Sequence, residues 1–153
     1  MDLAKHIQDI QTVLAPAVMV SSSALLLLGF QAKFSNLANR FRALNQERRQ
    51  LASRPDAGQT ERLRLASLVD QIAHLMLRAQ MVKNAILAAY AGIVCFMLTS
   101  VLIFFNVYAD FTLWTVIIIL FGAGLLSVLA SAVFMIGETR LFYKVIALER
   151  KSG

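Results

Sequence analysis

Three long stretches without a charged residue divide the chain. They cover residues 10–32, 84–109 and 111–137, and are 23, 26 and 27 residues long. About 20 apolar residues span the hydrocarbon core of a bilayer, so each stretch is long enough to cross a membrane as a helix. A helix is the expected element because it satisfies its own backbone hydrogen bonds in lipid. The pattern therefore predicts three transmembrane helices.

The segment between the first two stretches has apolar residues at alternating steps of three and four, the pattern of a coiled-coil seam. Pro55 and Gly58 interrupt this pattern and mark a turn. We therefore expect an antiparallel helical hairpin with two arms. The predicted seam consists of Phe34, Leu37, Phe41, Leu44 and Leu51 in the first arm and Leu65, Leu68, Ile72, Leu75, Ala79, Val82 and Ile86 in the second.

These elements predict an all-α membrane protein with three transmembrane helices and a helical hairpin between the first and the second. The expected organisation is an outer N-terminus with the first transmembrane helix (1–32), a cytoplasmic basic hairpin (33–84), the second and third transmembrane helices (85–137) and a cytoplasmic tail (138–153).

Composition and charge support this class and add an orientation. The chain is 58% hydrophobic and 16% charged, whereas soluble domains are about 45–50% apolar and about 25% charged. Residues 33–83 carry ten basic and four acidic side chains, a net charge of +6. Because Lys and Arg concentrate on the cytoplasmic side of a membrane, we expect the hairpin and the tail inside, and the N-terminus and the Asp110 loop outside.

The chain resembles a known family at this level of detail. The residues that carry the resemblance are Leu14 and Pro16, Ser21-Ser22, the Leu25–Leu28 run, Asn39-Arg40, Arg42 and Leu44, followed by Leu75, Arg78, Met81 and Ala85-Ile86. They are similar to the two characteristic stretches of the bacterial membrane family catalogued as domain of unknown function 2721, with Lys83 where that family often has Arg. The resemblance covers roughly residues 7 to 145 and implies a multi-pass protein of the bacterial inner membrane. It implies no catalytic residue.

Enzyme chemistry has little support in the sequence. The two histidines, His6 and His74, are expected on opposite sides of the membrane, and the single cysteine, Cys95, lies within the second apolar stretch. There is no Gly-rich phosphate loop, and the apolar stretches contain no carboxylate for a proton relay. We expect no enzyme activity, no cofactor and no metal site.

One face of the first apolar stretch is polar or small at most positions. It follows steps of four and three through Gln8, Thr12, Ala15, Met19, Ser22, Leu26, Gly29, Lys33 and Asn36; we call it the polar stripe. Such a face can line a water-filled pore, with Asp9 and Asp110 as acidic groups at the outer side. Small and hydroxyl-bearing residues also serve helix packing in membranes, so both interpretations stay open.

Other residues bear on assembly and partners. Small residues suited to close helix packing recur at Ala123, Ser127 and Ser131 in the third stretch and at Gly92 in the second. Three helices cover little of their own apolar surface, so a homo-oligomer is expected. Arg40 and Arg42 are suited to anionic lipid head groups or to the inner mouth of a pore. Exposed aromatic platforms are missing beside them, so nucleic acid is not an expected partner.

Two functional hypotheses follow. The first is a homo-oligomeric channel for inorganic ions that is lined by the first transmembrane helix, with cations favoured over anions. The second is a non-conducting membrane scaffold whose basic hairpin docks a cytoplasmic partner or anionic lipid. They differ in whether the polar stripe is in contact with water.

Overall fold

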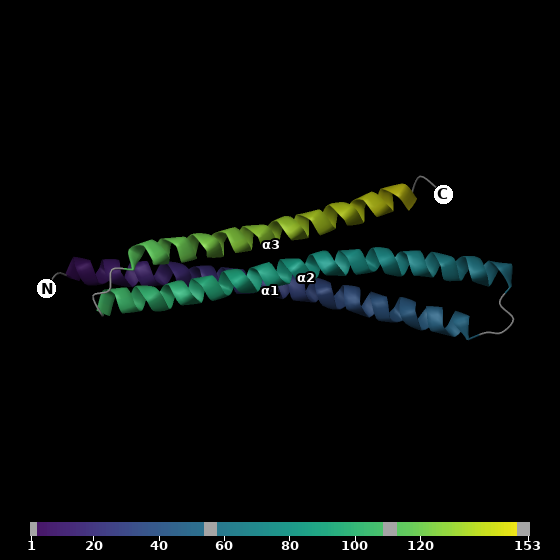
Figure 1. Ribbon diagram of the computed structural model, residues 1–153, viewed down its shortest axis with the longest axis horizontal. Helices are drawn as coiled ribbons and strands as arrows, with labels where there is room; N and C mark the ends of the chain where they lie inside the picture. Colours follow the sequence, from purple (N-terminus) through teal and green to yellow (C-terminus); the bar gives the residue numbers. More distant parts are fainter. Residues whose placement is uncertain (1–2, 54–57, 109–112, 150–153) are drawn as a thin grey trace. The chain divides into compact units, whose positions relative to one another are not determined.

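The computed structural model is all-helical over the residues that it describes (Figure 1). Its helices are α1 (Leu3–Ala52), α2 (Gln59–Tyr108) and α3 (Trp114–Glu149). The backbone is described for residues 3–53, 58–108 and 113–149, and side chains for residues 11, 14–53, 58–106 and 113–140. All three helices are long and apolar enough to cross a membrane, which indicates a multi-pass membrane protein.

The helices are much longer than a bilayer requires. Helices α1 and α2 have 50 residues each, which corresponds to about 75 Å at 1.5 Å per residue. The hydrocarbon core of a bilayer is about 30 Å thick. Each of these two helices therefore combines one membrane span with a long extension. Helix α3 has 36 residues and continues without a break to Glu149, so it includes residues 138–149 of the segment 138–153 that was expected to be a tail.

The chain forms two compact units, and each takes a part of every helix. Unit 1 comprises residues 1–29 and 85–133, and unit 2 comprises residues 30–84 and 134–153. Unit 1 holds most of the charge-free sequence, and unit 2 holds the basic segment.

Each helix buries residues at steps of seven. The buried positions are Pro16, Ser23, Phe30 and Leu37 on α1, Leu68, Leu75, Val82, Ala89, Phe96 and Ile103 on α2, and Ile117, Gly124, Ser131 and Glu138 on α3. A second core position is buried at Leu27 on α1 and at Ala85, Gly92 and Thr99 on α2. A repeat of seven with two core positions is typical of left-handed coiled-coil packing.

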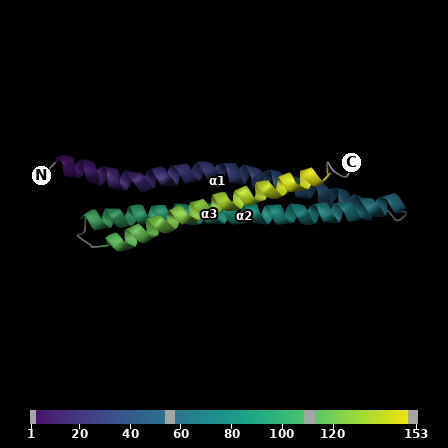
Figure 2. The same ribbon diagram turned by 90° about the horizontal axis from the view of Figure 1, so that it is seen from above.

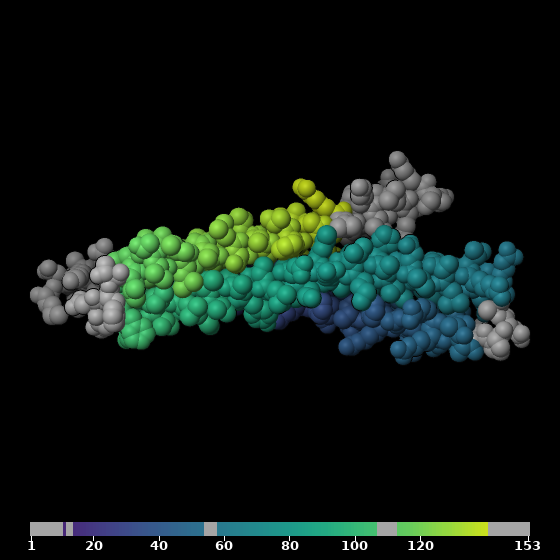
Figure 3. Space-filling view, in the orientation of Figure 1, coloured from purple at the N-terminus to yellow at the C-terminus, as the bar shows by residue number. Residues whose placement is uncertain are grey.

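Close backbone approach between α2 and α3 organises unit 1. A Cβ atom added at Gly92 would lie 2.6 Å from Val128 Cγ2 and 3.1 Å from the Gly124 carbonyl oxygen. Phe96 packs against Gly124 and places its ring 5.5 Å from the ring of Phe121. In the space-filling view, the last part of α2 and the first part of α3 lie directly against each other (Figure 3).

Unit 2 places the second half of α1 beside the first half of α2 (Figure 2). The predicted seam residues from Leu37 to Val82 are buried or half-buried in this unit, whereas Phe34 is 39% exposed. The last predicted seam residue, Ile86, is half-buried and belongs to unit 1. Arg64 Nη2 on α2 lies 2.8 Å from Glu47 Oε1 on α1. Apolar packing and this ion pair together join the two segments.

Side chains also close the helix ends. Gly58 N donates to Glu61 Oε2 (3.3 Å) while Glu61 N donates to the Gly58 carbonyl (3.1 Å), a reciprocal cap at the start of α2. Before α3, Leu113 N donates to Asn106 Oδ1 over 2.9 Å. These bonds satisfy backbone groups that the helices themselves leave open.

Candidate functional site

Unit 2 contains a buried cluster of three ionised side chains, one from each helix. It consists of Lys33 on α1, Arg78 on α2 and Glu138 on α3, and we call it the ion cluster. The Glu138 side chain is completely buried, whereas Arg78 is 16% exposed and Lys33 is 37% exposed. The carboxylate is therefore enclosed, and Lys33 connects it to the surface.

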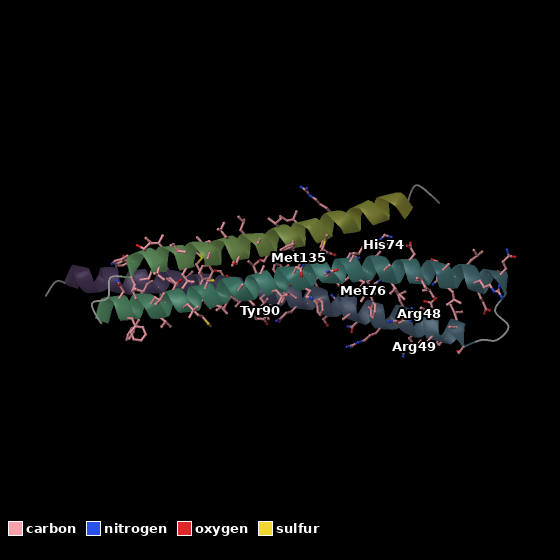
Figure 4. All side chains as sticks on the ribbon, in the orientation of Figure 1. Arg48, Arg49, His74, Met76, Tyr90 and Met135 are labelled. Atoms are coloured by element: carbon pink, nitrogen blue, oxygen red, sulfur yellow. The ribbon has the colours of Figure 1, made fainter. Side chains whose placement is uncertain are left out.

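Both carboxylate oxygens of Glu138 face a cation. Arg78 donates to Oε1 through Nε (2.9 Å) and Nη2 (2.7 Å). The Lys33 ammonium forms an ion pair with Oε2 and also lies 3.4 Å from Thr139 Oγ1 and 3.9 Å from Met135 Sδ. Met135 is on α3, one turn before Glu138 (Figure 4). The cluster thus fixes the ammonium group against α3.

The charge balance of the ion cluster explains how the carboxylate is tolerated. A buried carboxylate is strongly unfavourable unless it is paired and hydrogen-bonded. Glu138 has two cationic partners, so its charge is compensated and the cluster retains a net charge of +1. Because the partners come from α1 and α2, the cluster attaches α3 to both helices within unit 2.

Sequence reasoning missed this cluster. Glu138 served only as the boundary of the third charge-free stretch, and Arg78 only as part of a family resemblance. A signal was nevertheless present, because Glu138 continues the seven-residue steps of Gly124 and Ser131, and Arg78 lies seven residues before Ala85. Both charged residues therefore occupy core positions of the heptad pattern.

The structure places the described part of the polar stripe on an open face of α1. Its exposed members are Ala15, Met19, Ser22, Leu26, Gly29 and Asn36, and the half-buried one is Lys33. The side chains of Gln8 and Thr12 lie outside the described residues. Between Ala15 and Gly29, every stripe residue is followed directly in the sequence by a buried or half-buried residue of α1. The polar stripe is thus rotated by about 100° from the packed face, since a helix has 3.6 residues per turn.

The remaining predicted residues fall in different places. Arg40 and Arg42 are exposed in unit 2, whereas Asp9 and Asp110 lie outside the described side chains. In unit 1, Ser131 and Gly92 are buried, while Ala123 and Ser127 are half-buried. The basic and the small residues therefore belong to different compact units.

The described residues contain no group of three His, Cys, Asp or Glu side chains that could hold a metal ion. His74, on α2 (Figure 4), lies with its Nε2 atom 3.7 Å from Asp70 Oδ1, one turn earlier on the same helix, and both side chains are exposed. Cys95 is half-buried and has a free thiol. Among the described residues, we therefore take the ion cluster as the candidate functional site.

The three cluster residues lie within a recognised family region. The family described as Protein of unknown function (DUF2721) matches residues 13–148. The chain belongs to this family. The DUF2721 region contains Lys33, Arg78 and Glu138 together with the whole polar stripe from Ala15 onward. No curated protein and no solved structure matches the chain.

Proposed function

We propose that this DUF2721 protein is a homo-oligomeric ion channel in which copies of α1 surround a central pore. Conduction is passive, and cations pass more readily than anions. The observation that carries the proposal is the open polar stripe, since neither α2 nor α3 covers the described stripe positions between Ala15 and Gly29. These positions span about 21 Å along the helix axis, which is most of the hydrocarbon thickness.

The chemistry of the polar stripe supports a wet environment. Ser22 Oγ donates to the Val18 carbonyl over 3.0 Å, so its proton is satisfied inside the helix while its oxygen can accept from water. Met19 and Leu26 supply apolar constrictions of the kind that gate by dewetting. A Cβ atom added at Gly29 would meet no neighbouring helix within 4 Å among the described residues, so packing inside the protomer does not require a glycine there.

The ion cluster bears on ion preference. Lys33 belongs to the polar stripe, and an uncompensated ammonium group there would repel cations. Its pairing with Glu138 removes much of that repulsion, because the carboxylate is close on one side of it. The ion cluster still carries a net charge of +1, so pairing weakens the repulsion of cations at Lys33 without reversing it. The proposed cation preference therefore rests on the acidic Asp9 and Asp110 at the outer end.

Single-channel recording on purified protein in planar bilayers tests the proposal. Wild-type protein should give discrete currents whose reversal potential in a KCl gradient indicates cation preference. Ser22→Trp should reduce the conductance at least tenfold because the indole fills the path. The matched control is Leu28→Trp, which changes a 62% exposed residue on another face of α1 and should leave the conductance unchanged.

Two results would contradict the channel. The first is the absence of current from wild-type protein under any tested ion and voltage. The second is a monomer in mild detergent and in nanodiscs, because the three helices of one copy cannot enclose a pore.

The second candidate is a non-conducting scaffold. It is favoured by the exposed Arg40 and Arg42 on a helix that is far longer than a membrane span.

In both cases we place the protein in the bacterial inner membrane, with its N-terminus outside and the basic segment 33–84 in the cytoplasm. A protein that oligomerises without conducting ions would favour the scaffold.

A further inference from the structure

Unit 2 contains an apolar groove between α1 and α2 that is separate from the ion cluster. The groove is open on one side and has a volume of about 300 Å³. Its walls are the side chains of Phe34, Leu37 and Phe41 on α1 and of Leu75, Met76 and Ala79 on α2. Met76 is on the first half of α2 (Figure 4). The groove therefore lies along the contact between the two helices.

Small and incompletely covered residues create the groove. Ala38 and Ala79 line it and supply only a methyl group each. Met76 remains 61% exposed and Phe34 39% exposed. Covering apolar surface of this kind is favourable by about 25 cal/mol for each Å² removed from water. An apolar chain would bind there on hydrophobic grounds.

Arg42 gives the groove a cationic end. It lines the cavity and is exposed, and within the described residues it has no acidic partner. A guanidinium group binds a carboxylate through two parallel hydrogen bonds, which makes it more selective than a point charge. The surrounding segment, residues 33–83, has a net charge of +6 and so favours an anion over a cation.

We propose that this groove binds a long-chain fatty acid, with the acyl chain against Phe34, Phe41 and Met76 and the carboxylate on Arg42. The cavity volume is at the lower end of the range for small-molecule sites, about 300–1,000 Å³. It suits one acyl chain and not the two chains of a phospholipid. All of these residues belong to unit 2, and none of them belongs to the polar stripe that carries the channel proposal. Either proposal can therefore fail without the other.

Photo-crosslinking of the full-length protein tests the site. The protein is placed in nanodiscs of neutral phosphatidylcholine and exposed to a fatty acid that carries a diazirine on its chain, and the labelled residues are located by mass spectrometry. We expect saturable labelling of peptides around Phe34–Arg42 and Leu75–Ala79. Oleate should compete, and oleyl alcohol, which lacks the carboxylate, should compete at least tenfold more weakly.

Variants separate the groove from general lipid contact. Ala79→Phe fills the groove and should reduce labelling at least fivefold, as should Ala38→Phe from the opposite wall. Arg42→Gln should weaken oleate competition at least fivefold. The matched control is Arg48→Gln, an exposed arginine on the same helix outside the groove, which should have no effect. Circular dichroism and elution volume identify variants that remain folded.

Three outcomes would overturn the proposal. One is equal competition by the acid and the alcohol. Another is labelling that persists in both folded groove-filling variants or spreads evenly over the apolar surface of unit 1. The third is crosslinking of groove residues to a second copy of the chain, which would show that another protomer occupies the groove.

Discussion

Glu138 differs from the carboxylate of the exposed Glu47–Arg64 pair in how far its charge is shielded from water. Its side chain is fully buried and bound to Arg78 and Lys33. In the Glu47–Arg64 pair, the side chains are 38% and 51% exposed. Water and salt screen the exposed pair, and such pairs contribute about 0–1 kcal/mol to stability. Removing one member of a buried cluster leaves uncompensated charge and costs about 3–5 kcal/mol.

We expect Glu138→Gln to lower the free energy of unfolding by about 3 kcal/mol, because the substitution keeps the size and leaves two cations without a carboxylate. Glu47→Gln is the control and should cost less than about 1 kcal/mol. Unfolding by SDS in mixed micelles, followed by circular dichroism, measures both. Equal losses in the two variants would show that the ion cluster does not stabilise the fold.

At the scale of the elements, glycine decides how closely α2 and α3 approach. A Cβ atom at Gly124 would lie 2.7 Å and 2.9 Å from carbons of the Phe96 ring and 3.2 Å from Cys95 Cβ. A Cβ atom at Gly122, two residues earlier on α3, would have no neighbour within 4 Å among the described residues. The two glycines lie on the same helix, but the ring of Phe96 lies next to the Cα atom of Gly124 and not next to that of Gly122. Gly124 is therefore required by packing, and Gly122 is not.

Gly124→Ala should destabilise the protein by about 1–3 kcal/mol, because the ring of Phe96 must move to admit the methyl group. Gly122→Ala should be neutral or stabilising by up to about 1 kcal/mol, since alanine is the better helix former. The SDS unfolding midpoint measures both changes. A Gly122→Ala variant as unstable as Gly124→Ala would contradict a packing role specific to Gly124.

At the scale of the whole molecule, the distribution of charge leads to an orientation that can be measured. Lysine and arginine are concentrated in residues 33–83, whereas Asp110 is the only charged residue in the connection between α2 and α3. Basic segments next to membrane spans stay in the cytoplasm. The orientation follows from charge alone and remains a prediction.

A Cys95→Ser background makes this prediction testable with single cysteines. Asp110→Cys should react with a membrane-impermeant maleimide in intact cells, because its loop is expected outside. Gly58→Cys, next to the start of α2, should react only after the membrane is permeabilised. The reverse pattern of labelling would invert the topology and, with it, the assignment of the inner and outer ends of the proposed pore.

Much of the fold was predictable because it is a property of continuous sequence. The three apolar stretches correspond to the three helices. The three-four pattern from Leu37 to Val82 identified four of the five described residues of α1 and α2 that are buried in unit 2. The ion cluster was not predicted. Charged residues were used only to mark the ends of the apolar stretches. They were therefore not considered as core residues, although Arg78 and Glu138 continue the heptad pattern of buried positions.

The sequence by itself determined the helical membrane class, the family and the apolar seam of the segment between the first two spans, because these depend on runs and periods that neighbouring residues define. Only the tertiary structure decided that Glu138 is enclosed between Arg78, 60 residues earlier, and Lys33. It also decided that the polar stripe is left open from Ala15 to Gly29 and that two alanines leave a groove beside Arg42. These features depend on how the helices are rotated against one another, and packing sets that rotation.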